Sequence, residues 1–261
     1  MARNIKSNRI VIKIGTNAIT DNSGMLDLKV IQSLVAQIAE IKNSKDVIII
    51  TSGAIGAGMK EINLQERPND IVMKQVCAAI GQNILMTAYH SLFEKYNIKI
   101  AQILLTYDVF SNKKKFLNLR NSMNKLLDLG VIPIINENDP ISIDEIGPSF
   151  GDNDILSALI SSKMKADLLI ILTNVDGLFN KNPNDKDAVF IREVRKINKK
   201  IESVSSETSN LGLGGMKTKI KAAKIATKAG INVIIANGKR QGILVRILNN
   251  EDVGTIFYPQ K

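Results

Sequence analysis

Four segments of this chain combine glycine, lysine and small polar residues in patterns that suit the binding of anions or carboxylates. Each follows a short apolar run or opens an amphipathic stretch. In open α/β sheets, ligands bind beyond the carboxyl ends of the strands, so residues that follow strands are the first candidates for chemistry. The four segments are Lys13–Asn17, Thr51–Gly58, Ile135–Pro140 together with Gly151–Asp154, and Gly212–Lys219.

The first segment places a lysine inside an apolar strand. Burying Lys13 is costly unless its ammonium meets an anion. Gly15 would let backbone N–H groups approach a phosphate closely. The competing explanation is a lysine whose stem is buried while its head reaches water at a strand end.

The second segment, Thr51–Gly58 (TSGAIGAG), predicts an anion-binding helix start. It follows a strand and precedes a helical pattern, so unpaired N–H groups and the positive end of a helix dipole would face a carboxylate or phosphate. Its G-x-x-G-x-G spacing differs from the dinucleotide fingerprint, which disfavours an NAD site. Close packing that simply requires small residues is the alternative.

The third segment ends a buried strand in Asn136-Glu137-Asn138-Asp139 and continues, after an excursion, with Gly151–Asp154. Carboxylates here could bind an amine or a divalent metal, and the amides could bind a carboxylate. Helix capping is a serious competing role for Asp152.

The fourth segment is a glycine loop that runs into a basic helix, ending in Lys217-Thr218-Lys219. It lacks the G-x-x-x-x-G-K spacing of a Walker A motif. Glycines, a helix N-terminus and a lysine nevertheless suit a triphosphate. The single histidine, His90, lies in the middle of a helical pattern, where a catalytic base is not expected. If the phosphoryl acceptor is a carboxylate, with a pKa of about 4.3, no base is needed.

The elements that must position these segments alternate between strand and helix. Short, branched, nearly continuous apolar runs predict strands buried on both faces of a parallel sheet, and periods of three and four residues predict helices. We therefore expect an α/β fold, a three-layer α/β/α sandwich with a mainly parallel central sheet, in one domain over residues 1–261. The expected strands are Ile10–Ile14, Val47–Thr51, Ile100–Thr106, Val131–Asn136, Leu168–Thr173 and Val233–Ala236; the expected helices are Asp27–Lys42, Ile71–Tyr96, Lys115–Leu129, Asp154–Lys165 and Met216–Ala229; and Asn180–Asp187 is expected to be an exposed loop.

Composition limits the class of protein. With 44% hydrophobic and 23% charged residues, the chain is globular. The lone Cys77 and the lack of an apolar run near 20 residues predict a soluble cytoplasmic protein without a membrane span. Of the net charge of +10, residues 181–261 carry 16 basic and 7 acidic side chains. This excess fits either a polyanionic ligand or a solvated helix face.

The motifs resemble those of the glutamate 5-kinases, within the amino acid kinase family, over Ile10 to about Tyr258. Ile134–Asp139 (IINEND), Gly151–Asp154 (GDND) and TSGAIGAG carry the resemblance most specifically. It implies ATP-dependent phosphorylation of the γ-carboxylate of L-glutamate to L-glutamyl 5-phosphate, the first step of proline biosynthesis. The part up to about residue 165 would bind glutamate, and the part from about 166 would bind ATP with Mg2+.

The resemblance also implies roles for particular residues. Lys13 and Lys219 would stabilise the transferring phosphoryl group, and Asp154 would orient them. No protein side chains are expected as metal ligands, because the phosphates would carry Mg2+. Glutamate would be held by Ser52, Gly53, Ala54, Asn136, Asp139 (on the α-amino group) and Asn153; ATP would be held by Lys13, Gly15, Thr173, Asn174, Leu213, Gly214, Gly215, Met216, Lys217, Thr218 and Lys219.

Three features depart from the family pattern. Asn174 stands where many members have Asp, and Leu213 stands where a small polar residue is frequent. The chain ends at Lys261, so we expect a form without the C-terminal PUA domain.

The resemblance further implies a homodimer or homotetramer with proline as feedback inhibitor. The alternatives are kinases of the same fold that act on acetylglutamate, aspartate, carbamate or UMP, or an RNA-binding protein; binding to nucleic acid is not expected, because the basic region lacks interleaved aromatic residues.

Overall fold

The computed structural model describes residues 3, 5–21, 24–141, 152–207 and 215–260. Its centre is an eight-stranded sheet in which all neighbouring strands are parallel except β9 and β10, which are antiparallel. Two short strands, β6 (Leu178–Phe179) and β7 (Phe190–Ile191), form a separate hairpin-like pair. The order across the large sheet is β3 (Ile100–Leu105), β4 (Ile132–Glu137), β2 (Asp46–Ile50), β1 (Arg9–Ile14), β5 (Leu168–Thr173), β9 (Asn232–Asn237), β10 (Thr255–Phe257) and β8 (Glu193–Val194).

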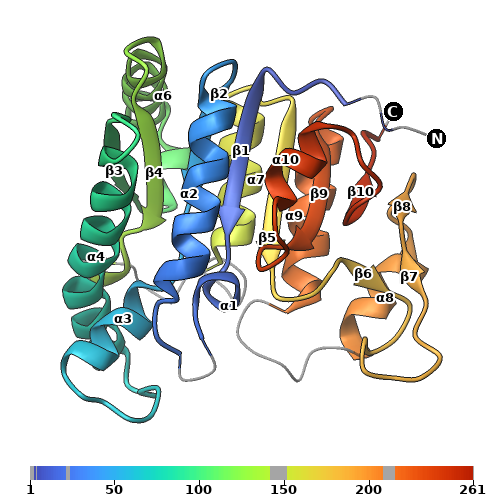
Figure 1. Ribbon diagram of the computed structural model, residues 1–261, viewed down its shortest axis with the longest axis horizontal. Coiled ribbons are helices and arrows are strands. Elements are labelled where there is room, and N and C mark those ends of the chain that lie inside the picture. The colour runs from blue at the N-terminus through green and yellow to red at the C-terminus, as the bar shows by residue number, and fades with distance from the viewer. Residues whose placement is uncertain (1–2, 4, 22–23, 142–151, 208–214, 261) are drawn as a thin grey trace.

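Helices cover both faces of this sheet (Figure 1). Alternate side chains of the central strands pack into two separate hydrophobic clusters, as the period of two requires. One cluster joins the sheet to α2 (Leu28–Lys42), α4 (Ile71–Glu94) and α10 (Ile243–Leu248), and the other joins it to α6 (Lys113–Asp128), α7 (Asn153–Lys163) and α9 (Met216–Lys228). The shorter helices are α1 (Thr16–Ile19), α3 (Ala54–Glu61), α5 (Asp108–Ser111), α8 (Lys199–Glu207) and the 3-10 turn η1 (Asp139–Ile141). The predicted three-layer sandwich is confirmed.

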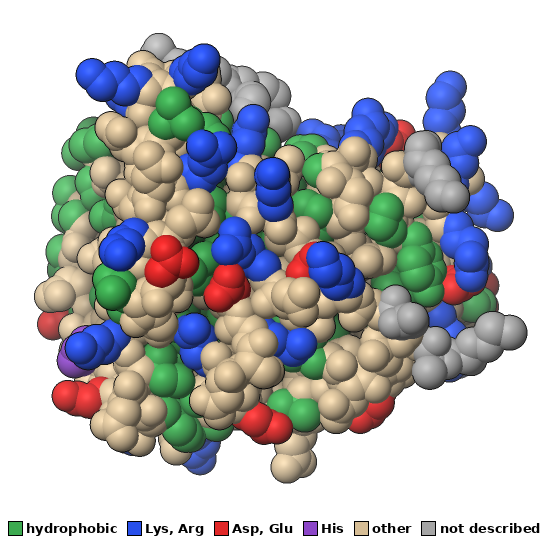
Figure 2. Space-filling view, turned by 90° about the horizontal axis from the view of Figure 1, so that it is seen from above, with side chains coloured by type: hydrophobic (Ala, Val, Ile, Leu, Met, Phe, Trp, Pro, Cys, Tyr) green, Lys and Arg blue, Asp and Glu red, His purple; other side chains and the backbone are tan. Residues whose placement is uncertain are grey.

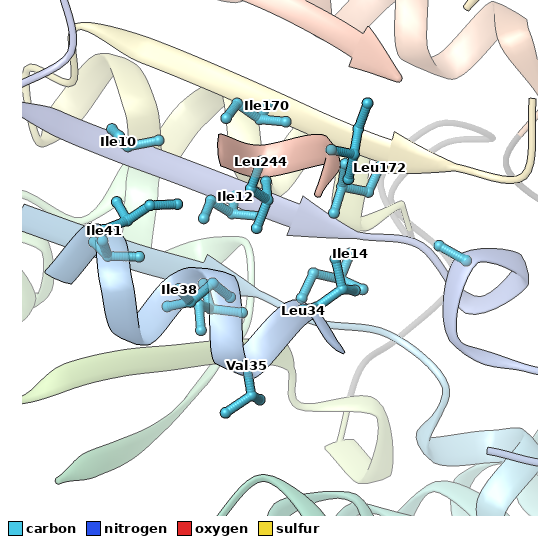
Figure 3. Packing of buried hydrophobic residues seen from close by; sticks show 14 of the residues in the cluster. Ile10, Ile12, Ile14, Leu34, Val35, Ile38, Ile41, Ile170, Leu172 and Leu244 are labelled. Carbon is cyan, nitrogen blue, oxygen red and sulfur yellow. The ribbon is translucent and has the colours of Figure 1, made fainter. Parts of the chain in front are cut away.

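The packing of α2 on the sheet illustrates why these residues form these elements. In Figure 3, Leu34 and Ile38 of α2 point towards Ile12 and Ile14 of β1. The predicted cap is present as well, because the Asp27 carboxylate accepts hydrogen bonds from the Lys29 N–H (3.1 Å) and the Val30 N–H (3.2 Å).

The expected strands and helices all occur, with ends shifted by at most a few residues. The expectation of burial on both faces is wrong for β3, because β3 lies at the edge of the sheet and is mostly half-buried. The short elements β6, β7, β8 and β10 had not been expected. The predicted exposed loop over Asn180–Asp187 is present, between β6 and β7.

Within the part of the chain that the structure describes, helix α4 alone is long and apolar enough to match a membrane span. Length and composition are weak criteria, since core helices of globular proteins also meet them. One face of α4 packs into the sandwich through Leu85, Tyr89 and Phe93. The helix therefore belongs to the layered fold.

Two glycines set how closely α3 and α4 approach each other. A Cβ atom on Gly58 would lie 1.8 Å from the Cys77 carbonyl oxygen, and one on Gly81 would lie 1.8 Å from that of Ala54. No side chain fits at either distance, so the two helices are in backbone contact. This contact fixes the start of α3 beside the end of β2.

Candidate active site

The carboxyl ends of the central strands open into one large cavity of about 1510 Å³. Segments far apart in the sequence meet there, as the strand-end argument predicted. Asp154 lies beneath the cavity, completely buried. Leu213, Gly214 and Gly151 lie outside the described residues. The predicted site residues that line the cavity are Lys13, Gly15, Ser52, Gly53, Ala54, Asn136, Asp139, Asn153, Thr173, Asn174, Gly215, Met216, Lys217, Thr218 and Lys219.

Asp154 joins two lysines that come from opposite ends of the chain. Its carboxylate pairs with the Lys13 ammonium at 2.6 Å and the Lys219 ammonium at 3.1 Å, and accepts a hydrogen bond from the Thr218 hydroxyl at 3.0 Å. Both lysines are over 90% buried. Burial alone would raise the pKa of Asp154, but the two lysines outweigh it and lower that pKa, so the carboxylate is ionised. Two cations against one anion leave a net positive charge facing the cavity.

Gly15 gives the Lys13 ammonium its space. A Cβ atom on Gly15 would lie 3.3 Å from Lys13 Nζ and 3.1 Å from the Leu172 carbonyl oxygen. The Gly15 N–H donates to Leu172 at 3.1 Å, so this N–H group is already used within the protein. Any backbone N–H that approaches a phosphate here must come from a neighbouring residue.

The N-terminus of α3, at Gly53 and Ala54, is suited to bind an anion, and we call it the anion seat. Gly53 precedes the helix in a left-handed conformation (φ 105°), which favours glycine, and no side chain caps the helix. The first N–H groups of the helix have no partner within it and carry the positive end of its dipole. The two explanations of TSGAIGAG therefore each apply to a part of it: Gly53 and Gly56 line the cavity, whereas Gly58 serves the packing of α3 on α4.

A group of amide side chains lies beside this seat. The Asn153 amide nitrogen is 3.0 Å from the Thr51 carbonyl oxygen, 3.0 Å from Ser52 Oγ and 2.8 Å from Asn136 Oδ1. Asn136 in turn donates to Gln82 Oε1 at 2.8 Å. Sequence reasoning missed Gln82. Its only signal was a polar residue next to a glycine in the apolar stretch of α4.

The acidic residues of the third segment have different roles. Asp152 caps α7, accepting a hydrogen bond from the Asp154 N–H at 2.8 Å, so the capping explanation is confirmed for it. Asp139 begins η1 and faces the cavity, as does Arg67. Burial lowers the pKa of Arg67 and the charge of Asp139 opposes this, so the two side chains are within electrostatic reach. Arg67 was not among the predicted residues, because a loop arginine carries no distinguishing pattern.

The other half of the cavity is formed by the turn after β5 and the start of α9. Thr173 is buried and Asn174 is exposed. A carboxylate does occur near this turn, at Asp176, where it pairs with Arg240 (2.6 Å) and accepts from the Asn237 amide (3.0 Å). Asn174 therefore stands beside a charged group that is already engaged by the protein.

Lys217 and Lys221 also reach this cavity. Both are exposed, in contrast to the buried Lys219.

Comparisons with known proteins show the family of this chain. The family model described as the amino acid kinase family matches residues 8–237. The chain is 47% identical to a glutamate 5-kinase of Methanosarcina barkeri, covering 97% of this chain and 69% of that protein, and 47% identical to one of Clostridium acetobutylicum, covering 97% and 95%. In fold it resembles a carbamate kinase from Giardia lamblia bound to AMP-PNP (TM-score 0.67, 16% identity, covering 97% of this chain and 98% of that one). It also resembles a UMP kinase from Bacillus anthracis (TM-score 0.65, 18% identity, 98% and 97%). The chain belongs to the amino acid kinase family, among its glutamate 5-kinases.

Proposed function

We propose that this protein transfers the γ-phosphoryl group of ATP to the γ-carboxylate of L-glutamate, giving L-glutamyl 5-phosphate, the first step of proline biosynthesis. The observation that carries the proposal is the buried Lys13–Asp154–Lys219 cluster. Its two lysines line the same cavity as the amide side chains of Asn136 and Asn153 and as the start of α9 at Gly215. The identity to glutamate 5-kinases over nearly the whole chain supports the choice of substrate.

The chemistry requires two anions to approach each other. The γ-carboxylate is ionised at neutral pH and needs no general base. The obstacle is the charge of the phosphoryl group, which Lys13 and Lys219 would offset while Asp154 keeps their ammonium groups in place. Because these lysines are held before substrate binds, little reorganisation is needed during transfer.

Glutamate would lie across the amide group and the start of α3. The N–H groups near Gly53 and Ala54 would bind its γ-carboxylate, while Ser52, Asn136 and Asn153 would hold the other end. Asp139 would pair with the α-amino group, because a carboxylate is the natural partner of an ammonium.

ATP would occupy the half of the cavity lined by Thr173, Asn174 and Gly215–Lys219. Bound Mg2+ would neutralise part of the phosphate charge. Among the described residues no three His, Cys, Asp or Glu side chains gather as a metal site. Leu213 and Gly214 are further expected contacts of the nucleotide.

This division of the cavity supports a division of the chain, with glutamate bound by residues up to about 165 and ATP by those from about 166 onwards. Proline would compete in the glutamate half, because it shares the ammonium and α-carboxylate of glutamate. A cytoplasmic location accords with the supply of ATP.

We also propose a homodimer or homotetramer. Helix α4 exposes Ile71, Val72, Met73 and Val76, and Ile141 of η1 is exposed on a segment that packs against α4. Exposed apolar side chains of this kind are typical of an interface. Analytical ultracentrifugation should show an assembly that Val72→Lys weakens; a wild-type monomer at micromolar concentration would contradict this.

The activity itself is tested by ADP release from ATP and Mg2+ with a panel of acceptors. L-Glutamate should give the highest kcat/KM, ahead of N-acetylglutamate, aspartate, carbamate and UMP. Preference for another member of this panel, or no glutamate-dependent release, would overturn the proposal.

A further inference from the structure

Three amide side chains from three different elements form a continuous chain beneath the glutamate half of the cavity. Gln82 comes from α4, Asn136 from β4 and Asn153 from the first turn of α7. Gln82 and Asn136 are 8% and 2% exposed, and Gln82 does not line the cavity. Gln82 therefore does not touch a ligand in the cavity. Its side-chain oxygen accepts from Asn136, and its amide nitrogen has no hydrogen-bond partner among the described residues.

Two groups, the Glu137 N–H and the Gln82 side-chain oxygen, set the direction of this chain at the two ends of the Asn136 amide. The Glu137 N–H donates to Asn136 Oδ1 at 2.9 Å, and only the oxygen of that amide can accept it. The Asn136 nitrogen must then point the other way, towards Gln82 Oε1 at 2.8 Å. Asn153 must likewise present its nitrogen to Asn136 Oδ1, at 2.8 Å.

One acceptor is left over at the end of the chain. Asn153 Oδ1 is buried and has no hydrogen-bond partner among the described residues. Leaving a buried acceptor unpaired costs free energy, so a donor from a ligand would be favoured there. An ammonium group such as the α-amino group of glutamate supplies such a donor.

We infer that Gln82 is a positioning residue for glutamate: it holds the Asn136 amide in the orientation that turns Asn153 Oδ1 into an acceptor for the substrate. Without Gln82 the Asn136 nitrogen would be buried without an acceptor. This cost would favour rotation of the Asn136 side chain and loss of its contact with Asn153. The inference rests on the proposed function, because it takes glutamate as the ligand.

The helix packing explains how Gln82 reaches this position. Gly81, the preceding residue, brings α4 into backbone contact with Ala54 at the start of α3. A polar side chain on this part of α4 is thus carried to the end of β4, 54 residues away in the sequence.

The test is steady-state kinetics of Gln82→Met, which keeps the length of the side chain and removes its amide. KM for glutamate should rise about tenfold, as for a buried group left without a partner, while KM for ATP and kcat stay within about twofold. Gln82→Ser, which is too short to reach Asn136, gives the same test if Gln82→Met does not fold.

Gln37 provides a matched control. It is also 8% exposed, and its side chain accepts from the Leu244 N–H at 2.8 Å, remote from the cavity. Gln37→Met should lower the thermal midpoint and leave KM for glutamate unchanged. Equal increases of KM for both glutamines would overturn the inference, because they would show a general loss of structure.

A double-mutant cycle separates action through Asn136 from other routes. In an Asn136→Ala background, Gln82→Met should cause little further rise in KM for glutamate; full additivity would overturn the inference. If the wild-type protein is active on glutamate and Gln82→Met leaves its KM unchanged, only the inference fails. If the wild-type protein shows no glutamate-dependent ADP release, the proposed function fails instead.

Discussion

At the scale of single residues, the site depends on one buried carboxylate that serves two buried lysines. Asp154 is 0% exposed, and without Lys13 and Lys219 its charge would be too costly to bury. Conversely, Asp154 holds the ammonium group of each lysine in place through an ion pair. The lysines are thus positioned before substrate arrives, and this is the arrangement that electrostatic stabilisation of a transition state requires.

Lys219→Met should lower kcat by about 100-fold or more, roughly 3 kcal/mol, because it removes only the charge from a buried side chain that we propose faces the phosphoryl group. Circular dichroism should show an intact fold. Lys228→Met, at the exposed last residue of the same helix, is the control and should keep kcat within about twofold of wild type. Equal, small losses for the two variants would show that α9 is only a basic surface helix.

Asp139→Ala should raise KM for glutamate far more than KM for ATP. Loss of a charge-assisted hydrogen bond to an ammonium costs about 1.5–3 kcal/mol, or one to two decades in kcat/KM. Steady-state kinetics with each substrate varied in turn would measure this. A raised KM for ATP with an unchanged KM for glutamate would place Asp139 in the wrong half of the cavity.

At the scale of elements, backbone contact between α3 and α4 sets the place of the anion seat. Gly58 and Gly81 leave no room for a Cβ atom, so even the smallest side chain must push the two helices apart. A shift of α3 would move Gly53 and Ala54 away from the lysines. Packing and binding are therefore coupled through two glycines.

Gly81→Ala should lower the free energy of unfolding by about 2–4 kcal/mol and also raise KM for glutamate, because the new methyl group would collide with the Ala54 carbonyl. Urea unfolding and kinetics would measure both effects. Gly56→Ala, in the first turn of α3, is the milder control for stability alone: its Cβ would lie 3.3 Å from the Gly24 carbonyl oxygen, and alanine favours the helix by about 1 kcal/mol. A more stable Gly81→Ala protein would contradict the packing argument.

The elements with long, strongly patterned sequences could be predicted, and those that depend on distant contacts could not. An apolar run such as Ile10–Ile14 predicts a buried strand without further information, and Asp27 indicates the start of a helix. By contrast, β8 and β10 are only two and three residues long. They are strands because β10 pairs with β9 on one side and with β8, the last strand of the sheet, on the other. The role of Gln82 could not be predicted either, because its hydrogen-bond partner Asn136 lies in another element, 54 residues away in the sequence.

The site residues could be predicted as a set because the strand-end rule places them at one edge of the sheet. Their contacts could be predicted only in part. The resemblance implies that Asp154 orients Lys13 and Lys219, and the polar residues before α7 allow a cap at Asp152. That one fully buried carboxylate pairs with both lysines, while Asp152 caps the helix that carries it, follows only from the three-dimensional packing.

At the scale of the whole molecule, charge is spread well beyond the site. Figure 2 looks down on the face at the top of Figure 1, opposite the carboxyl end of β1, and shows lysines and arginines dispersed over it and interspersed with acidic side chains. Much of the net charge of +10 is therefore solvated surface rather than part of the cavity. At this same end, Asp167 ties the start of β1 to that of β5: its carboxylate accepts from the N–H groups of Asn8 (2.8 Å) and Arg9 (3.0 Å) and pairs with Lys6 (3.1 Å).

Asp167→Asn should make stability less dependent on acid pH. Burial raises the pKa of Asp167, but these hydrogen bonds and the charge of Lys6 together lower it by more than burial raises it. The pKa of Asp167 in the folded protein is therefore below the unfolded value near 3.9. The resulting stabilisation is complete above that unfolded value and is lost as pH falls through the folded one. We expect a cost of about 1–2 kcal/mol at pH 7 that shrinks towards pH 2.5, measured by urea unfolding. Asp185→Asn, in the exposed loop, should show no such change, and a cost of Asp167→Asn that is independent of pH would contradict the assignment.

The most direct test of the account is to identify the product. Incubation with ATP, Mg2+, L-glutamate and hydroxylamine should yield γ-glutamyl hydroxamate in a ratio of about one to one with ADP, because an acyl phosphate reacts with hydroxylamine as the leaving phosphate departs. Lys219→Met should lower the formation of both by the same factor. Release of ADP without hydroxamate would contradict transfer to the γ-carboxylate of glutamate.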